Sequence, residues 1–474
     1  MPRSLFIFFK FQSTKIMKKN FTLTGAASIF ILASAISIFN TSCTPSTAGE
    51  AKTVTTATTG STIPQLLPRQ GELSTTEEWT RTQTAVNAAI KKIEKDPNDH
   101  NSYIKLAEIY VNEARVTGEH GYYYPAILSL LDNLLAKNPT GDIPFKAMSL
   151  KSSVYLSLHQ FATARETAEQ AAKLNPDNAQ IYGALVDANV ELGNYPEAVK
   201  MAETMMDKRP DLLSYSRASY LREIHGDPKG AIQAMTMAVE SGYPGFENTA
   251  WTRNTLAHIY ETYGDLVSAE TQYKNTLAER PNYPFALAGL ASIEKKKGNV
   301  KEAEKLLNDA AGIIPEVAFY AELAELYQST GRTAEAEKTT TDVLAMMADD
   351  EAKGHMMSLE YAKVYMNLVH DYDKALAYAI TEYAARPTNI DVNKALAEIY
   401  FRKGNIREAE KHLSIAFSTG SKNPELLMIA GLISFANGNA KQGFDFVKTS
   451  RETDPYQDTQ FSKEAENAMA SIKN

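Results

Sequence analysis

The chain has 474 residues, 44% of them hydrophobic, which suffices for several domains or for one extended array of repeats. Its single cysteine excludes an internal disulfide framework and any metal site built from several thiolates. The formal net charge is −8, and so acidic a chain repels phosphate backbones, so nucleic acid is not expected as a partner. An anionic membrane surface is equally unfavourable for the body of the chain, so membrane attachment would require an anchor.

The first 42 residues differ in charge from the rest of the chain. They hold five basic side chains and no acidic one, and without them 44 basic residues stand against 57 acidic residues. From Met17, two lysines precede an apolar stretch over 21–39, and small residues lead to Cys43. This order is typical of a secretory signal over residues 17–42, and residues 1–16 are interpreted as an upstream extension. An uncleaved signal anchor is the alternative, although the stretch is weakly hydrophobic for a spanning helix.

With Cys43 at its end, this segment resembles a bacterial lipoprotein signal. Ser42 and Thr41 suit the positions before the cleavage site, whereas Asn40 departs from the apolar residue that the family prefers. The resemblance implies that Cys43 is lipidated and anchors an exported cell-envelope protein, which faces the periplasm or the cell surface. Two or three acyl chains give stable membrane attachment, where one chain would be marginal.

Residues 43–75 are rich in Thr, Ser, Ala, Gly and Pro and show no apolar periodicity over most of their length. This composition predicts a flexible tether. A tether of this kind would hold the body of the protein on the order of 30 Å from the bilayer.

A short pattern then recurs through the chain: a Gly, or a variant of it, is followed five positions later by a small residue. The small residues are Ala164, Ala198, Ala231, Ala269, Ala303, Ala336, Ala375, Ala409 and Gly443, and their spacings are 34, 33, 38, 34, 33, 39, 34 and 34. Two repeats, HQFATA (159–164) and HDYDKA (370–375), replace the Gly by His. A period of 33 to 39 residues indicates one supersecondary unit repeated along the chain.

Each unit reads as two helices. Tracts such as ELAELY (322–327) and ALAEIY (395–400) place Leu, Ala and Tyr at helical spacing, which predicts a helix A before the Gly. The Gly supplies a left-handed turn, helix B presses its small residue against helix A, and a proline often follows twelve positions later. The 38- and 39-residue spacings place insertions near 241–249 and 349–355, where the array could bend.

In period, turn and packing residues the chain resembles the tetratricopeptide repeat (TPR) family. The resemblance implies an all-α, right-handed superhelix of about ten helix–turn–helix repeats over residues 76–455. Residues 77–97 are expected to form a lone helix B, and 117–125 a loop inserted into the first full repeat. Residues 456–474 are expected to hold a capping helix with Phe461, Ala465 and Ala468 facing inward.

The sequence contains no HExxH, no GxSxG, no phosphate-binding glycine loop and no carboxylate pair with a partner base. The eight histidines fall in different repeats, away from metal-ligand spacing. We therefore expect no enzyme activity, no cofactor and no metal, and interpret the array as a protein-interaction scaffold.

In this family helix A lines a concave groove through a few fixed repeat positions. The resemblance assigns a partner-binding groove to the matching positions Tyr220, Glu223, Trp251, Asn254, His258, Glu261, Phe285 and Lys295. Exposed Trp is a frequent interaction hot spot. Two alternatives stay open: Trp251 packs against the preceding insertion, or His258 is simply solvated or bonded locally.

One specialised use of the fold does not match. Chaperone-docking members hold a terminal carboxylate with a Lys and an Asn, and here Lys394 is accompanied by Glu398 instead. The sequence therefore favours a scaffold that binds a protein or peptide of unspecified identity. A lipoprotein that captures a glycan or small peptide is the alternative.

Overall fold

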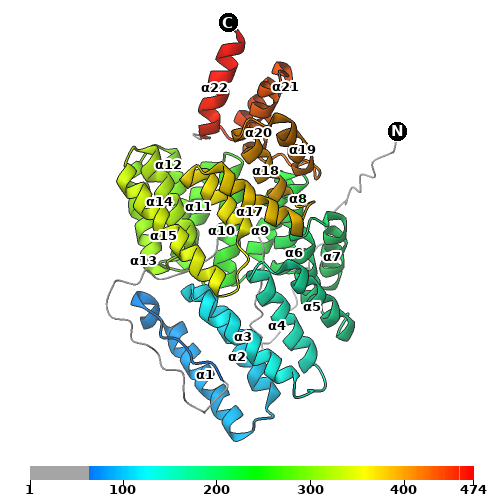
Figure 1. Ribbon diagram of the computed structural model, residues 1–474. Helices are drawn as coiled ribbons and strands as arrows, with labels where there is room; N and C mark the ends of the chain where they lie inside the picture. The colour runs from blue at the N-terminus through cyan, green and yellow to red at the C-terminus, as the bar shows by residue number, and fades with distance from the viewer. Residues whose placement is uncertain (1–62, 458–459, 474) are drawn as a thin grey trace, which may run out of the picture. The chain divides into compact units, whose positions relative to one another are not determined.

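The computed structural model describes residues 63–457 and 460–473, and within these ranges the chain is helical and contains no β-strand. Figure 1 shows the helices following one another along the chain as packed neighbours. Cys43, the segments 1–16 and 17–42, and the first part of the expected tether lie outside the described residues.

Ten helix pairs occupy the predicted register, each with a helix A and a helix B. The helices A are α2 (His100–Thr117), α4 (Ile143–Ser157), α6 (Ala179–Glu191), α8 (Leu212–Ile224), α10 (Glu247–Thr262), α12 (Pro284–Lys296), α14 (Val317–Ser329), α16 (Ser358–Val364) with the π-helical turn η2 (Tyr365–Val369), α18 (Ile390–Arg402) and α20 (Pro424–Ala436). The helices B are α3 (His120–Leu135), α5 (Phe161–Leu174), α7 (Tyr195–Lys208), α9 (Pro228–Glu240), α11 (Leu266–Glu279), α13 (Val300–Ile313), α15 (Thr333–Ala352), α17 (Tyr372–Ala385), α19 (Ile406–Ala416) and α21 (Ala440–Thr453). The prediction of an all-α array of about ten helix pairs is confirmed.

The turn between the two helices of a repeat adopts the left-handed backbone conformation. Gly193 has a φ of 76°, which a residue without Cβ adopts at little cost. In the two variant repeats His159 and His370 take its place with φ of 57° and 58°. The helix pair therefore forms even where the glycine is missing.

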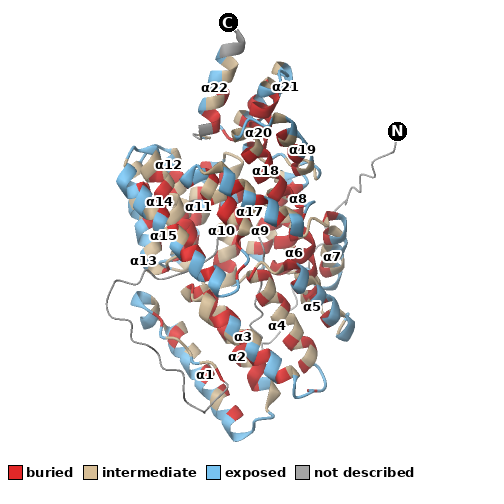
Figure 2. Cartoon of the chain, in the orientation of Figure 1, coloured by how far each residue is buried: buried red, intermediate tan, exposed pale blue. Residues whose placement is uncertain are grey.

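The small residue of helix B lies at the tightest contact of each pair. Each of Ala164, Ala198, Ala231, Ala269, Ala303, Ala336, Ala375 and Ala409 is at most 3% exposed. Gly443 is buried too, and a Cβ there would collide with the ring of Phe435. Burial is greatest on helices A such as α8 and α18, whereas helices B such as α7 and α13 keep one exposed side (Figure 2).

The expectation of an inserted loop at 117–125 is wrong. Helix α2 ends at Thr117 and α3 begins at His120, so the three tyrosines of this stretch belong to the first turns of α3. Tyr123 is fully buried and stacks on Tyr110 of α2 with ring centroids 5.5 Å apart. The aromatic rings supply the apolar face that holds α3 against α2, and this contact favours a helix over a loop.

Part of the expected flexible tether is also packed. Residues 63–75, which we call the N-terminal strap, lie against α2 and α3 and end in the short 3₁₀ helix η1 (Gly71–Thr75). Arg69 is buried and its Nη2 lies 2.6 Å from Oε1 of Glu113, and the hydroxyl of Tyr110 donates to the carbonyl of Pro64 at 2.5 Å. The average composition of 43–75 does not reveal this packing, because the apolar side chains and the one arginine of the segment are concentrated near its end.

Two further helices flank the pairs. Helix α1 (Glu77–Lys95) packs on α2, and α22 (Gln460–Lys473) packs on α20 and α21. Phe461 and Ala465 of α22 are buried in the same apolar cluster as Ile429 and Ile433 of α20. Apolar surface of the last helix pair is therefore covered by α22.

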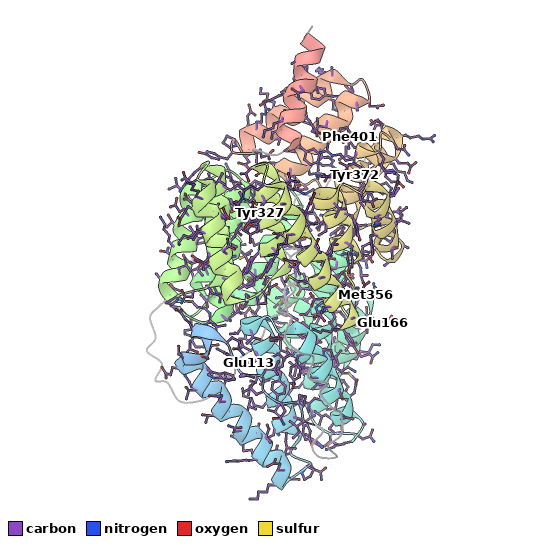
Figure 3. All side chains as sticks on the ribbon, turned by 60° about the vertical axis from the view of Figure 1, so that its left-hand side comes forward. Glu113, Glu166, Tyr327, Met356, Tyr372 and Phe401 are labelled. Atoms are coloured by element: carbon purple, nitrogen blue, oxygen red, sulfur yellow. The ribbon has the colours of Figure 1, made fainter. Side chains whose placement is uncertain are left out.

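Segments far apart in the sequence touch one another in the array. Hydrogen bonds join residues 194 to 198 positions apart, including Gln160 to Gly354 and Asn389 to Glu191. Met356, labelled in Figure 3, donates its backbone N–H to the carbonyl of Leu158 at 3.1 Å. Consecutive turns of the superhelix are therefore in direct contact.

Candidate partner-binding surface

The predicted groove residues lie on three successive helices A. Tyr220 and Glu223 lie on α8, the four residues from Trp251 to Glu261 lie on α10, and Phe285 and Lys295 lie on α12. Helix α10 contacts both α8 and α12. The register therefore brings these residues onto adjacent helices.

Two of the predicted residues are engaged inside the protein. Glu261 is buried, and its carboxylate accepts a hydrogen bond from the Tyr273 hydroxyl at 3.0 Å and pairs with Nζ of Lys296 at 3.3 Å. The ring centroid of Phe285, which is half-buried, lies 5.6 Å from that of Phe319 on α14. Both residues hold neighbouring helices together.

Four others remain accessible. His258 and Lys295 are exposed, and Trp251 and Asn254 are half-buried. No described residue donates a hydrogen bond to Oδ1 of Asn254. Nζ of Lys295 lies 3.8 Å from a carboxylate oxygen of Glu325 on α14. The four side chains form an accessible patch on α10 and α12, although Oδ1 of Asn254 itself is buried.

Although exposed, His258 is surrounded by protein. Burial lowers the pKa of its imidazole, and Glu261 opposes this effect while Lys296 adds to it. An accessible side chain that still feels desolvation lies on a surface with protein on several sides, because a convex surface would leave it in bulk water.

The same combination of partial exposure and desolvation occurs on α8. Burial raises the pKa of Glu223 to about 7, and the nearby Asp391 of α18 raises it further by repulsion. Burial also raises the pKa of Tyr220 well above its ordinary value. Glu223 and Asp391 belong to repeats that are far apart in the sequence, yet their charges interact.

We call the set Glu223, Glu322, Glu325, Glu398 and Glu425 the inner acidic surface; Glu398 is buried and the other four are half-buried or exposed. Burial raises the pKa of Glu322 and Glu398 to about 8 each, and it also raises that of Glu325. Glu425 repels both Glu325 and Glu398, although Lys394 keeps the pKa of Glu425 itself low. The helices A of four repeats thus bring carboxylates close enough to repel one another, while Lys295, Lys394 and Arg402 face some of them and oppose this effect.

Only Glu223 of this surface was among the eight groove residues assigned from the sequence. Glu425 occupies the second position of its repeat, so the same register extended along the array would have found it. Glu322 occupies the sixth position, outside the positions that the family resemblance nominates. Its charge matters here only because Glu325 and Glu261 lie near it in space.

The described residues show no sign of a metal centre or a membrane span. Residues 63–457 and 460–473 contain no group of three or more His, Cys, Asp or Glu side chains that could hold a metal ion. None of the helices in those ranges combines the length and the apolar character needed to cross a bilayer.

These features define an all-α repeat array of the class that serves as a scaffold for protein interactions. Residues 155–222 match the family described as tetratricopeptide repeat, and the same helix pair recurs from α2 to α21. The chain therefore contains tetratricopeptide repeats, and its helices form a TPR superhelix.

Similarity to known proteins is distant. The chain is 25% identical over 197 residues to cellulose synthase 1 operon protein C of Komagataeibacter xylinus, and 24% identical over 201 residues to cellulose synthase operon protein C of the same organism. Each alignment spans 39% of this chain but only 15% of the relative's length.

Solved structures resemble the chain as well. A thermophilic TPR protein of Thermus thermophilus is 19% identical, with 41% of this chain and 98% of that chain covered and a TM-score of 0.36. The human IFIT1 dimer is 12% identical, with 78% and 86% covered and a TM-score of 0.44.

Proposed function

We propose that this protein is a non-enzymatic scaffold of the bacterial cell envelope that binds an extended, basic segment of a partner protein along the inner acidic surface. The proposal rests on one observation: several accessible carboxylates are surrounded by protein and repel one another. A segment with Lys or Arg side chains would relieve this repulsion on binding.

The electrostatics also give the proposal a pH signature. Carboxyl groups with pKa values of about 7 at Glu223 and about 8 at Glu322 are partly protonated near neutral pH. A bound cation favours their ionised forms, so binding releases protons. Affinity for a basic segment is therefore expected to be higher in alkaline than in mildly acidic buffer, on either side of these pKa values.

The location at the cell envelope rests on separate support. Residues 17–43 have the order of a lipoprotein signal that ends in Cys43, which would be the lipid anchor. The distant relatives are named after a cellulose synthase operon. The proposed arrangement is a membrane-anchored array whose groove faces the periplasm or the cell exterior.

Site-specific photocrosslinking in native membranes tests the binding surface. A photoreactive amino acid at position 258 is expected to capture one protein through a peptide that contains more Lys and Arg than Asp and Glu. The same label at position 166, an exposed site on α5, is the control (Figure 3). Crosslinks at position 166 alone would show that the partner binds elsewhere.

Charge reversal shows whether the carboxylates are responsible. Glu322→Lys combined with Glu425→Lys is expected to lower the crosslinking yield at position 258 at least tenfold, and the surface control Glu166→Lys is expected to leave it unchanged. Circular dichroism confirms that the variants are folded. An unchanged yield in the double variant would contradict the inner acidic surface as the binding site.

A glycan-capturing lipoprotein is the second candidate, and one feature favours it. Tyr243 and Phe246, in the connection between α9 and α10, are 77% and 55% exposed, with ring centroids 6.2 Å apart. Exposed aromatic rings offer apolar faces on which sugar rings could stack. Calorimetry with cello-oligosaccharides tests this candidate, which requires saturable binding that is lost in a Tyr243→Ala, Phe246→Ala variant.

A further inference from the structure

Three histidines from distant parts of the chain meet where two turns of the superhelix touch. His120 begins α3, His159 forms the turn between α4 and α5, and His355 lies in the connection between α15 and α16. The ring centroid of His355 lies 6.4 Å from that of His120 and 6.5 Å from that of His159. We call these three residues the histidine junction.

The junction lies inside a contact made largely by the backbone. The N–H of Met356 donates to the carbonyl of Leu158 at 3.1 Å, and Nε2 of Gln160 donates to the carbonyl of Gly354 at 3.0 Å. Nδ1 of His159 lies 3.1 Å from the carbonyl oxygen of Met356. Separation of the two turns would break these three interactions together.

Two of the three histidines are almost completely shielded from solvent. His120 and His355 are 6% and 3% exposed. Neither ring nitrogen of His355 has a hydrogen-bond partner among the described residues, and Nδ1 of His120 lies 2.9 Å from the Tyr124 hydroxyl. Burial lowers the pKa of His355 to about 3 and that of His120 to about 4.

Charged groups face the junction from every side. Oε1 of Glu316, just before α14, lies 3.7 Å from Nε2 of His120, and Oε1 of Glu360 on α16 lies 3.8 Å from Nδ1 of His159. The other facing groups are Arg115 of α2, Glu119 before α3, Asp350 of α15 and Lys353 after α15. Arg115 and the neighbouring histidines oppose protonation, Glu119 and Glu360 favour it, and burial is the largest of these effects. The Glu316 carboxylate beside Nε2 of His120 also favours the charged ring.

A neighbouring contact has the opposite pH dependence. Glu191, which pairs with Arg386 across the same two turns, has a pKa raised to about 7 by burial. A raised carboxyl pKa stabilises the closed state as the pH falls, whereas the lowered histidine pKa values destabilise it. The contribution of the histidines must therefore be measured at the junction itself and against variants that lack them.

We propose that the histidine junction is a pH-sensitive latch, in which protonation of His120 and His355 below about pH 6 loosens the contact between residues 353–357 and the turn at 158–160. Because hydrated imidazoles titrate near their ordinary pKa, acidification from about pH 7.5 to about pH 5 favours the open contact about 30-fold for each histidine that opening exposes. The size of this effect depends little on the pKa values of the closed state, because both lie below the acidic end of that range.

Hydrogen exchange in the full-length protein measures this opening directly. The reporter is the Met356 amide, whose protection depends on the Leu158 carbonyl across the contact. After correction for the intrinsic pH dependence of exchange, its protection is expected to fall at least tenfold between about pH 7.5 and about pH 5, and its logarithm to change with a slope of about one to two per pH unit below about pH 6. Amides inside α20 serve as the control and are expected to change much less.

Two variants identify the titrating group. His355→Phe and His355→Gln cannot be protonated, and whichever keeps wild-type protection at neutral pH is expected to lose less protection on acidification. His225→Gln, a change at an exposed histidine, is expected to behave like the wild type. Unchanged wild-type protection over the whole pH range would overturn the latch. Equal losses in the wild type and the His355 variant would overturn it too. If the contact is already open at neutral pH in both variants, the test is the slope of the logarithm of Met356 protection against pH in the wild type. A slope near zero rejects the proposal.

Discussion

Removal of the Arg386 guanidinium tests how strongly the two turns of the superhelix are joined. Nη1 of Arg386 lies 2.5 Å from Oε2 of Glu191, and its Nε pairs with Glu382 on the preceding helix α17. The side chains of Arg386 and Glu191 are each 5% exposed, and the guanidinium lies 4.7 Å from the centroid of Phe161. Arg386→Met keeps most of the side-chain volume but leaves two carboxylates without their cation.

The expected cost is large because the charges left behind are buried. Loss of one partner from a buried ion pair costs about 3–5 kcal/mol. If the contact between the turns bears this cost, the equilibrium constant for its opening rises about 10² to 10³-fold, since each ~1.4 kcal/mol is a factor of ten. The free-energy cost of Arg386→Met should therefore exceed that of breaking any exposed ion pair by several-fold.

Hydrogen exchange provides the assay. The N–H of Ile390 donates to the Tyr195 hydroxyl at 2.8 Å across the same contact, so its protection reports the opening. Arg81→Met is the control, because Arg81 and Glu77 form an exposed pair with side chains 72% and 81% accessible. If Arg386→Met changes the protection of Ile390 no more than Arg81→Met does, the Arg386–Glu191 pair does not hold the two turns together.

The Arg386→Met effect should also depend on pH. The folded-state pKa of Glu191 is about 7, above its ordinary value, because burial outweighs the attraction of Arg386. Such a group contributes stability at pH values below its unfolded pKa and loses it as the pH rises through its folded pKa. Without Arg386 the ionised form is less favourable still, so the cost of the substitution should be smaller in mildly acidic than in alkaline buffer.

Two further predictions concern stability, measured as urea midpoints by circular dichroism. Ala336→Leu at the tight helix contact should cost about 1–3 kcal/mol, while Ala334→Leu on the exposed side of the same helix should change stability by less than about 0.5 kcal/mol; equal effects would contradict the packing argument. Glu322→Gln should raise the midpoint more at about pH 8 than at about pH 5, because burial raises the folded carboxyl pKa to about 8 while the unfolded chain ionises near its ordinary pKa, so the wild type loses stability as the pH rises between these two values. A difference that stays constant over this range would show that Glu322 titrates normally.

The repeat units could be predicted because their determinants are local. The Gly-to-Ala spacing and the Leu, Ala and Tyr pattern lie within one repeat, and each acts on a contact inside one helix pair. Gly193 could be read as a turn and Ala336 as a tight contact without knowledge of any other repeat. The prediction failed at the start of α3, because three consecutive tyrosines do not show the periodicity of an amphipathic helix.

The candidate surface was predicted only in part. The register placed His258 and Lys295 on exposed positions of helices A, but Glu261 and Phe285 satisfy the same register and pack inside the protein. What separates the two groups is the neighbouring helix, because Tyr273 and Lys296 bind Glu261. The position of a residue in the repeat determines the direction of its side chain from the helix axis. It does not determine which residues of other helices lie in that direction.

The sequence by itself determined the helix pairs, their order and the small residues that hold each pair together. Only the tertiary structure decided which turns meet, since a small rotation at every repeat accumulates over 195 positions before Arg386 reaches Glu191. The same accumulation gathers Glu223, Glu325 and Glu425 from separate repeats onto one surface. The pattern within one repeat does not reveal the total rotation of the superhelix, because each repeat contributes only a fraction of it.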